Sequence, residues 1–410
     1  MLEGRDIVCV SFVTWDDHWG TSQQQMSRLA AKNRVFFMDQ PISPLSFVTG
    51  VRRRSAVWRQ FKRWLAGPRP VAPNVWAGAP PPILPFRTNR FVNALNAAII
   101  RRWLAGCVRK LGFQDVIFWN FEPGLPGLSR GVQPALSVFH CVDDFSAIPY
   151  WWHSSGNQMR LEEQCCRDSN VVICTGRKLV ESRRRFNSNI HFVPEGADVA
   201  SFLAASTDAV TVPAAMAALR GKVVGYVGVI DFRLDVELLA CMAERRPQWS
   251  FALVGPMKGD TQDMTRLRAL PNVHFFGRQR LEDVPSFVKG MDVCLIPYVL
   301  NDYTHHIFPL KLYEYMAAGK PIVASAMEEM LPYEGAEMAI GRSPEDFLAK
   351  VDDAIATDSP DKAAARQQAA AHESWDDRVE QVSAILEPLL RERAPRAPGA
   401  AASASAMAGG

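Results

Sequence analysis

Short apolar runs alternate with helix-like segments along most of this sequence, and this alternation constrains the fold more than any other feature. Residues 7–13 and 35–38 are two such runs, and a helix-like segment over residues 23–32 separates them. A continuous apolar run of this length is typical of a strand buried on both faces, and the succession strand, helix, strand indicates parallel pairing. Ligand sites of such sheets lie on the loops that follow the strands.

The alternation occurs in two series, each long enough for one domain. Apolar runs lie at residues 7–13, 35–38, 115–119, 135–139, 170–174 and 190–193, and again at 222–227, 250–254, 273–276, 293–296 and 321–324. The stretch after Asp198, up to about residue 221, is alanine-rich with weak patterning, which indicates a link. We therefore expect an α/β protein with two doubly wound, Rossmann-like domains facing across a cleft, at residues 1–205 and 206–373.

Three further segments complete the expected organisation. Residues 71–87 are rich in proline, which predicts a rigid connection without an element of its own. Residues 374–390 have the amphipathic pattern of a helix. Residues 391–410 are mainly Ala, Pro, Gly and Ser, a composition that predicts a disordered tail.

Residues 51–70 contain seven basic residues and no acidic one. Trp58, Phe61, Trp64 and Leu65 recur within them at spacings of three and four, so that they form one apolar stripe on a helix. Such a helix suits an anionic membrane surface. The alternative is a helix that packs its stripe on its own domain and leaves its arginines solvated. No second segment extends the basic patch, so nucleic acid is not an expected partner.

The cysteines and the first residues of the sequence favour a location in the cytoplasm. The eight cysteines form no CxxC pair, and most lie in apolar runs, as is typical of buried free thiols in a reducing compartment. No Cys/His spacing fits a metal site, and none is expected. The start of the chain leads directly into a strand-like run, and no apolar segment is long enough to span a bilayer. We therefore expect a cytoplasmic protein with peripheral contact at the inner face of the cell membrane.

Residues 308–323 combine a helix start, a helix stop and a strand. Pro309 suits the first helical position, and Gly319 suits the residue that ends the helix. Lys311 and Glu314 lie three residues apart and therefore share one helical face. A cation and a carboxylate near the positive end of a helix suit a ligand with phosphates and hydroxyls. An ordinary surface ion pair is the alternative.

Two other strand ends of the second series carry polar or small residues. Gly228 ends one strand and Arg233 follows it, an arrangement that suits a phosphate, although a glycine at such a place is usually a turn. Arg278 follows another strand, where backbone groups could receive the edge of a base.

The first series carries two polar loops. Asp143 and Asp144 follow a strand, where one carboxylate could act as a general base, and a helix cap or turn is the alternative. Asp16 and His18 lie in a loop that is either solvent-exposed or forms a lip over an acceptor.

Three long stretches carry a resemblance to a known family. They read VGYVGVIDFRLDVELLACMAERRPQWSFALVGP, NVHFFGRQRLEDVPSFVKGMDVCLIPY and FPLKLYEYMAAGKPIVAS, and they cover most of residues 222–326. In this order they resemble the C-terminal domain of GT-B glycosyltransferases of the group 1, or family-four-like, type. The segment FHCVDDFSAI is similar to the strand end that carries the base aspartate of xanthan-type glucuronosyltransferases.

The resemblance implies a nucleotide-sugar donor bound by the second domain and a final helix that crosses back onto the first. By this resemblance, Glu314 would accept hydrogen bonds from the ribose hydroxyls. Lys311, Arg233 and the backbone N–H of Leu310 would bind the diphosphate. Asp143 matches the base aspartate. The implied donor-binding residues are Gly228, Arg233, Arg278, Phe308, Leu310, Lys311 and Glu314.

The chain departs from the family pattern at one position. Retaining family-four members carry a second glutamate eight residues before the position of Glu314, and His306 stands there in this sequence. His305 and His306 are therefore candidate sugar contacts, and both retention and inversion stay open.

We expect a metal-independent, hexosyltransferase-type glycosyltransferase of cell-surface or exopolysaccharide biosynthesis. It would move a sugar from a nucleoside diphosphate to a carbohydrate or lipid-linked saccharide, with no cofactor besides the donor. One alternative is a nucleotide-sugar epimerase of the same fold, which needs no acceptor. The other is an inactive GT-B scaffold, which binds no nucleotide.

Overall fold

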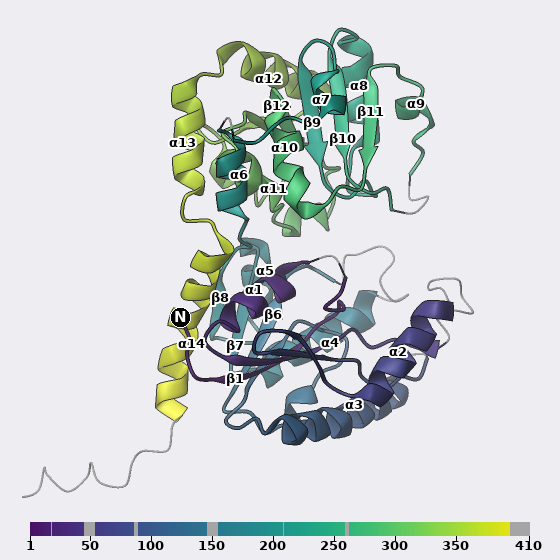
Figure 1. Cartoon of the computed structure of the whole chain (residues 1–410), viewed down its shortest axis with the longest axis vertical. Coiled ribbons are helices and arrows are strands. Elements are labelled where there is room, and N and C mark those ends of the chain that lie inside the picture. Colours follow the sequence, from purple (N-terminus) through teal and green to yellow (C-terminus); the bar gives the residue numbers. More distant parts are fainter. Residues whose placement is uncertain are drawn as a thin grey trace, which may run out of the picture. The chain divides into compact units, whose positions relative to one another are not determined.

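The computed structural model describes residues 1–17, 19–44, 54–85, 89–145, 155–207, 209–258 and 262–393. Its strands form two sheets covered by helices, so the expected α/β class is confirmed (Figure 1). Residue contacts divide the chain into two compact units. The first comprises Met1–Phe139, Asp168–Asn170 and the chain from Val379 onward, and the second His140–Arg167 and Val171–Arg378. The expected boundary between residues 205 and 206 stays a prediction.

The first sheet has the strand order β3-β4-β2-β1-β5-β6-β7-β8. β1 pairs in parallel with β2 and β5, and all five of its residues are buried, which explains why the four residues after Asp6 are apolar. All six apolar runs of the first series form strands. The strands are β1 (Asp6–Val10), β2 (Arg34–Met38), β3 (Arg69–Ala72), β4 (Val75–Gly78), β5 (Ile117–Asn120), β6 (Leu136–Cys141), β7 (Val171–Cys174) and β8 (Ile190–Phe192).

The prediction of a connection without elements over residues 71–87 is wrong at its start. β3 and β4 form an antiparallel hairpin there, and β4 also pairs in parallel with β2. Pro70 is tolerated because β3 is the edge strand, where a missing N–H leaves no ladder bond unmade. Asn74 takes a φ of 58° and makes the turn between the two strands.

The helices of this part of the chain include one close to the helix-like segment expected over residues 23–32 and one within the basic segment 51–70. They are α1 (Thr21–Leu29), α2 (Arg54–Ala66), α3 (Arg90–Leu111), α4 (Ser155–Asp168) and α5 (Arg177–Arg183), with a 3₁₀ turn η2 (Leu128–Gly131). The side chain of Asn89 accepts from two backbone N–H groups of the first turn of α3, and Gly112 ends this helix at a φ of 63°. Ile100 and Leu104 of α3 pack on the sheet in the apolar core of the first unit.

The second sheet has the order β11-β10-β9-β12-β13-β14, and every pairing is parallel. Its strands are β9 (Val223–Val227), β10 (Ser250–Val254), β11 (Val273–Gly277), β12 (Val293–Ile296), β13 (Ile322–Ser325) and β14 (Ala339–Gly341). The five expected strands are therefore confirmed. Close packing fills the interior: a Cβ on Gly225 of β9 would lie 2.1 Å from the sulfur of Met291.

The helices of the second unit differ from expectation at two places. The expected link contains α6 (Val199–Ala205), capped by Asp198, and α7 (Ala214–Ala217). The helix expected from Pro309 is α11 (Lys311–Ala317), which begins at Lys311 with Leu310 as its N-cap. Between β10 and β11 lies the short helix α9 (Thr265–Arg268). The others are α8 (Val236–Arg245), η3 (Leu281–Asp283), α10 (Val284–Lys289), η4 (Thr304–His306), η5 (Leu331–Tyr333), α12 (Pro344–Thr357) and α13 (Pro360–Ala370).

The last helix, α14 (Trp375–Arg393), confirms the helix expected over residues 374–390 and continues three residues beyond it. Residues 394–410 of the expected tail lie outside the described residues. In the part of the chain that the structure describes, none of the helices is long and apolar enough to cross a membrane.

Candidate functional site

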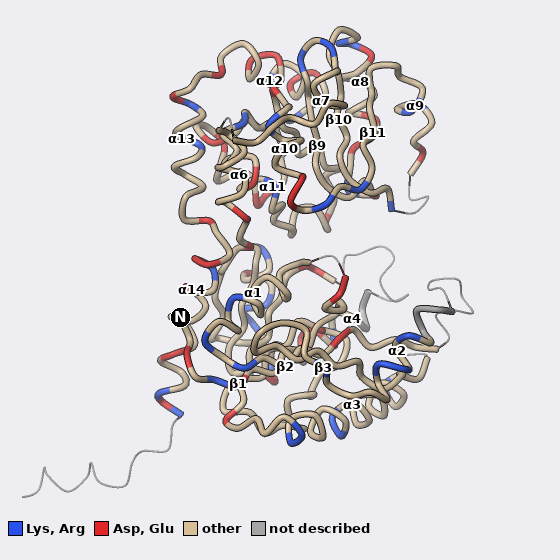
Figure 2. The backbone as a smooth tube through the Cα atoms, in the orientation of Figure 1, with Lys and Arg blue, Asp and Glu red and all other residues tan. Residues whose placement is uncertain are grey.

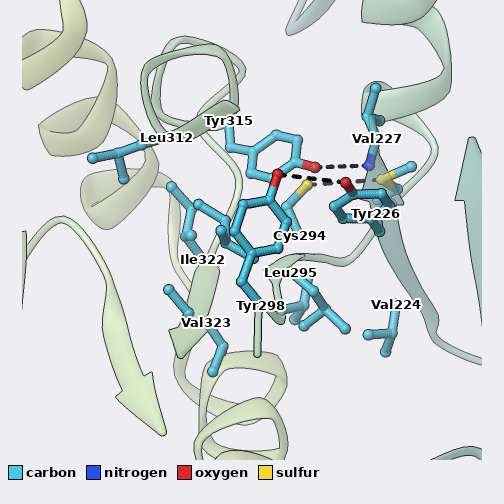
Figure 3. Close-up of a cluster of buried hydrophobic side chains, with 14 of the residues drawn as sticks. Val224, Tyr226, Val227, Cys294, Leu295, Tyr298, Leu312, Tyr315, Ile322 and Val323 are labelled. Carbon is cyan, nitrogen blue, oxygen red and sulfur yellow. Dashed lines mark hydrogen bonds between the residues drawn. The ribbon is translucent and has the colours of Figure 1, made fainter. Parts of the chain in front are cut away.

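Two tyrosines hold Lys311 at the carboxyl ends of the central strands of the second sheet. The Lys311 ammonium donates a hydrogen bond of 2.7 Å to the hydroxyl of Tyr298, which follows β12. It also lies 5.2 Å from the ring centroid of Tyr226 on β9 and 5.0 Å from that of Tyr298. The two tyrosine hydroxyls point toward each other, 3.5 Å apart (Figure 3). The positive charge of Lys311 is therefore fixed over the ends of β9 and β12.

Arg233 adds a second cation to this group. Its guanidinium makes two hydrogen bonds of 2.8 Å to the carboxylate of Asp231, and its Cζ lies 5.8 Å from the Tyr298 ring centroid. Burial raises the pKa of the Tyr298 hydroxyl, but Lys311 and Arg233 outweigh this effect and hold the pKa below its ordinary value. The site therefore favours negative charge.

Glycines let two loops pack closely at the same strand ends. Gly228, directly after β9, has a φ of 147°, and a Cβ there would lie 3.3 Å from Cε of Lys311. A Cβ on Gly255, after β10, would lie 1.9 Å from the carbonyl oxygen of Gly228. Only glycine fits at Gly255, because the two loops touch backbone to backbone. The backbone N–H groups of the two glycines donate to the carbonyl oxygens of Val254 and Gly277, at 2.9 Å each.

Glu314 lies one turn along α11 from Lys311. Burial raises the pKa of its carboxyl to about 7, Lys311 opposes the rise, and Asp198 adds to it. Its side chain is half-buried, and no described residue donates a hydrogen bond to it. A half-buried carboxylate with open acceptor positions suits the hydroxyls of a ligand.

Asp143 lies in the loop after β6 and interacts electrostatically with the same cation group. Burial raises the pKa of its carboxyl to about 7, the charge of Arg233 lowers it, and Asp144 and Glu162 raise it. Asp143 also raises the pKa of the buried Tyr303 hydroxyl, after the larger effect of burial. A carboxyl with a pKa near neutrality is suited to proton transfer.

Asp144 has a structural partner instead. The guanidinium of Arg183 on α5 lies 3.1 Å from the carboxylate of Asp144 and 2.7 Å from that of Glu162 on α4. All three side chains are at least 90% buried. Of the two neighbouring aspartates, the structure therefore ties Asp144 into an ion-pair cluster and leaves Asp143 half-buried.

The other predicted donor residues lie at different places. Arg278 is exposed beyond β11. Phe308 is buried against the rings of Tyr313 and Tyr333, with centroid distances of 5.0 and 5.8 Å. Leu310 immediately precedes α11.

The two candidate sugar contacts, His305 and His306, end the 3₁₀ turn η4. Nδ1 of His306 lies 2.5 Å from the carbonyl oxygen of Asp302, and Nδ1 of His305 accepts from the backbone N–H of Glu328 at 3.3 Å. Both rings are half-buried.

The loop predicted to contact an acceptor lies in the first unit. Asp16 bridges two arginines, at 2.7 Å from Arg63 of α2 and 2.5 Å from Arg69 of β3. His18 lies outside the described residues. The neighbouring Trp19 is 37% exposed and packs against Trp15 with a centroid distance of 5.4 Å.

Three residues of the cation group were not predicted from the sequence: Tyr226, Asp231 and Tyr298. Each lies on or just after a strand, and that position was the available signal. The two tyrosines resemble core residues and the aspartate carries no positive charge, so none of the three suggested a phosphate site. Within the described ranges, no group of three or more His, Cys, Asp or Glu side chains could hold a metal ion.

The two sheets define the fold. Two Rossmann-like sheets are the architecture of the GT-B fold of glycosyltransferases, so the expected GT-B fold is confirmed. Residues 221–357 match the family of glycosyl transferases group 1, and these residues carry β9 to α12.

Solved structures support the same fold. Sucrose-phosphate synthase from Thermosynechococcus elongatus has a TM-score of 0.68 and 16% identity, with 95% of this chain and 100% of that one covered. HepE of Anabaena, solved in complex with UDP and glucose, has a TM-score of 0.64 and 14% identity, with 93% and 98% covered. At these identities the likeness shows the fold alone.

One relative is similar in sequence. Over 138 residues the chain is 37% identical to TuaH of Bacillus subtilis (strain 168), which is named as a teichuronic acid biosynthesis glycosyltransferase. The match covers 32% of this chain and 34% of that protein. The chain thus spans about a third of the relative that it matches.

Proposed function

We propose that the protein is a glycosyltransferase that moves a sugar from a nucleoside diphosphate to a carbohydrate or lipid-linked saccharide. The observation that carries the proposal is the convergence of Lys311, Arg233 and Gly228 at the ends of β9 and β12, with Glu314 one helical turn away. The ammonium of Lys311, with Arg233 beside it, suits a diphosphate, and the carboxylate suits ribose hydroxyls. HepE, a fold neighbour, binds UDP and glucose, which supports this class of donor.

In the proposed reaction, the bond between the anomeric carbon and the diphosphate breaks, and negative charge develops on the leaving diphosphate. Lys311 and Arg233 would stabilise that charge. Because Tyr298 and Asp231 already hold the two cations, little reorganisation accompanies the reaction. We propose that these cations take the place of a divalent metal, so that neither a metal nor another cofactor is required.

Asp143 is the proposed general base. As a carboxylate it would remove the proton from the acceptor hydroxyl as that oxygen attacks the anomeric carbon. This role applies to a reaction with inversion. Retention stays open, because His306 stands where retaining members have a glutamate.

We also propose which residues contact the acceptor and where the protein works. Asp16 and His18 would contact the acceptor, and His305 and His306 the donor sugar. The acceptor would belong to cell-surface polysaccharide biosynthesis, as the name of TuaH indicates for that relative. The protein would work in the cytoplasm with α2 on the inner face of the membrane, since Trp58 and Leu65 of this basic helix are 60% and 66% exposed. Residues 52 and 53 of the basic run lie outside the described residues.

A donor panel tests the proposal. The protein is incubated with UDP-, GDP- and TDP-sugars, with and without oligosaccharide and lipid-linked acceptors, and the products are weighed by mass spectrometry. We expect a product heavier than the acceptor by one sugar. An isomerised donor in reactions without acceptor would indicate an epimerase instead. Absence of nucleotide binding by calorimetry would indicate an inactive scaffold.

A further inference from the structure

The outer face of α3 leaves large apolar side chains exposed. Phe91, Leu95 and Ile99 are 87%, 50% and 37% exposed. Residues four apart lie on successive turns of one helical face, so these three form a single stripe along the N-terminal half of the helix. We call them the α3 stripe. The opposite face, with Ile100 and Leu104, is buried in the core, so the exposure is not a consequence of a detached helix.

The charges on α3 have one sign. The helix contains Arg90, Arg101, Arg102, Arg109 and Lys110, and none of its 22 residues is acidic. Arg102 and Arg109 are exposed and continue the face of the stripe at helical spacing. Figure 2 shows the basic positions along this helix. The face is therefore apolar in its first half and basic in its second.

α2, in the same unit, has the same character. It has no acidic residue between Arg54 and Ala66, and the ammonium of Lys62 lies 5.7 Å from the exposed ring of Trp58. The C-terminal ends of the two helices approach each other, because a Cβ on Gly67 would lie 3.5 Å from Nζ of Lys110. The two basic, apolar helices thus belong to one region of the first unit.

We propose that the α3 stripe inserts into the interfacial layer of an anionic lipid bilayer, as a second membrane contact beside α2. The proposal deepens the membrane contact of the proposed function and rests on it. A basic helix with an apolar face lies about 5–10 Å into the boundary between headgroups and acyl chains. Anionic headgroups would neutralise the arginines. A second copy of this chain packed through the same face would instead bring arginines against arginines.

Partition onto vesicles tests the α3 stripe. Sucrose-loaded vesicles of phosphatidylcholine and phosphatidylglycerol in equal parts are sedimented with the full chain and with a Phe91→Ser, Leu95→Ser, Ile99→Ser variant. We expect partition to fall by at least about tenfold, since the loss of even one large apolar side chain from the lipid costs about that factor. The loss should persist at high salt, which screens charges but not apolar contacts. Leu281→Ser with Leu331→Ser is the matched control, because these leucines are 49% and 44% exposed in the second unit, and its partition should not change.

A second measurement reports insertion directly. A Phe91→Cys variant in a Cys241→Ser background is labelled with an environment-sensitive fluorophore, because Cys241 is half-buried and the other seven native cysteines are buried. We expect the emission to shift to shorter wavelength on these vesicles and not on pure phosphatidylcholine. An unshifted emission would contradict the proposal.

The outcomes separate this proposal from the others. If Trp58→Ser with Leu65→Ser releases the protein and the α3 variant does not, the α3 proposal is wrong and the α2 contact stands. If only the α3 variant releases it, the α3 proposal is supported and the α2 contact is wrong. If light scattering shows a dimer that the α3 variant converts to a monomer, a second copy covers the stripe and the proposal is wrong. Sugar transfer, assayed without vesicles on a water-soluble acceptor, reports on the glycosyltransferase function alone.

Discussion

The ammonium of Lys311 lies 2.7 Å from the hydroxyl oxygen of Tyr298, which is itself buried among the strand ends of the second sheet. Because the cation is oriented by a neutral hydroxyl and not by a carboxylate, its charge remains available to a ligand. Tyr298 is positioned by the strand β12, and Lys311 is positioned by the helix α11. These two elements therefore determine the distance between the ammonium and the hydroxyl.

Removal of this hydroxyl should weaken donor binding without unfolding the protein. In Tyr298→Phe the ring still fills its place, but Lys311 loses its partner and its fixed orientation. We expect the dissociation constant for the nucleoside diphosphate of the preferred donor to rise by about tenfold, the usual worth of a hydrogen bond to a charged group. Calorimetry measures it, and an unchanged constant would contradict the role.

Tyr315 provides the matched control. Its hydroxyl accepts a hydrogen bond of 2.8 Å from the backbone N–H of Val227 within the apolar core (Figure 3). Tyr315→Phe leaves that buried N–H without a partner, which should cost about 1–3 kcal/mol of unfolding free energy. Denaturant unfolding should therefore separate the two tyrosines: Tyr315→Phe loses stability, and Tyr298→Phe loses affinity.

Glu314 should determine affinity for the ribose in a pH-dependent way. Its pKa of about 7 means that the carboxylate, the form that accepts two hydroxyls, loses its charge as the pH falls below 7. We expect donor affinity to decline on acidification. Glu314→Ala should weaken donor binding by about ten- to a hundredfold at pH 8 and abolish the pH dependence. Glu282→Ala, at an exposed carboxylate, should bind the donor normally.

The protonation state of Asp143 should determine how turnover depends on pH. Its pKa is about 7, and a base works only when deprotonated, so turnover should fall as the pH drops through 7 and level off above it. Asp143→Asn should reduce turnover by about a hundredfold or more and leave donor affinity nearly unchanged. Near-normal turnover in this variant would remove Asp143 as the base.

The sequence predicted most strands of the sheets because a parallel strand with both faces buried is mainly apolar. All eleven expected runs became strands, including β11, which is only partly buried. The prediction failed at β3 and β4, because Pro70 disfavours a strand except at the edge of a sheet. It also failed in the expected link, because α6 is only seven residues long. Residue propensities and apolar patterns describe only local preferences. Edge strands and short helices depend on tertiary contacts, so these local signals do not predict them.

The site shows the same limit. Lys311, Glu314 and Arg233 could be predicted because charged residues near strand ends are conspicuous. Tyr226 and Tyr298 could not, since an aromatic residue beside an apolar run reads as core. Their role depends on two strands being neighbours in the sheet, and β9 and β12 are far apart in the sequence.

The ion-pair cluster behind Asp143 yields a prediction about stability. Arg183 faces the carboxylates of Asp144 and Glu162, and Glu162 is only 2% exposed. Arg183→Met would leave both carboxylates buried without their cation, which should cost about 3–5 kcal/mol of unfolding free energy. Arg185→Met is the control: Arg185 is 69% exposed, and its loss should cost less than about 0.5 kcal/mol.

The pH dependence of the Arg183→Met deficit distinguishes lost charge pairing from lost packing. Burial already raises the pKa of Glu162, and without Arg183 the rise should be larger. The folded state of the variant then holds a proton that the unfolded state releases, so its stability falls as the pH rises above the unfolded pKa of about 4.3. We expect the deficit relative to the unmodified protein to be larger at pH 8 than at pH 5, and Glu162→Gln added to Arg183→Met to recover part of it. If the deficit in unfolding free energy is equal at both pH values, the substitution destabilises the protein through lost packing. The charges of the cluster then do not stabilise the loop of Asp143.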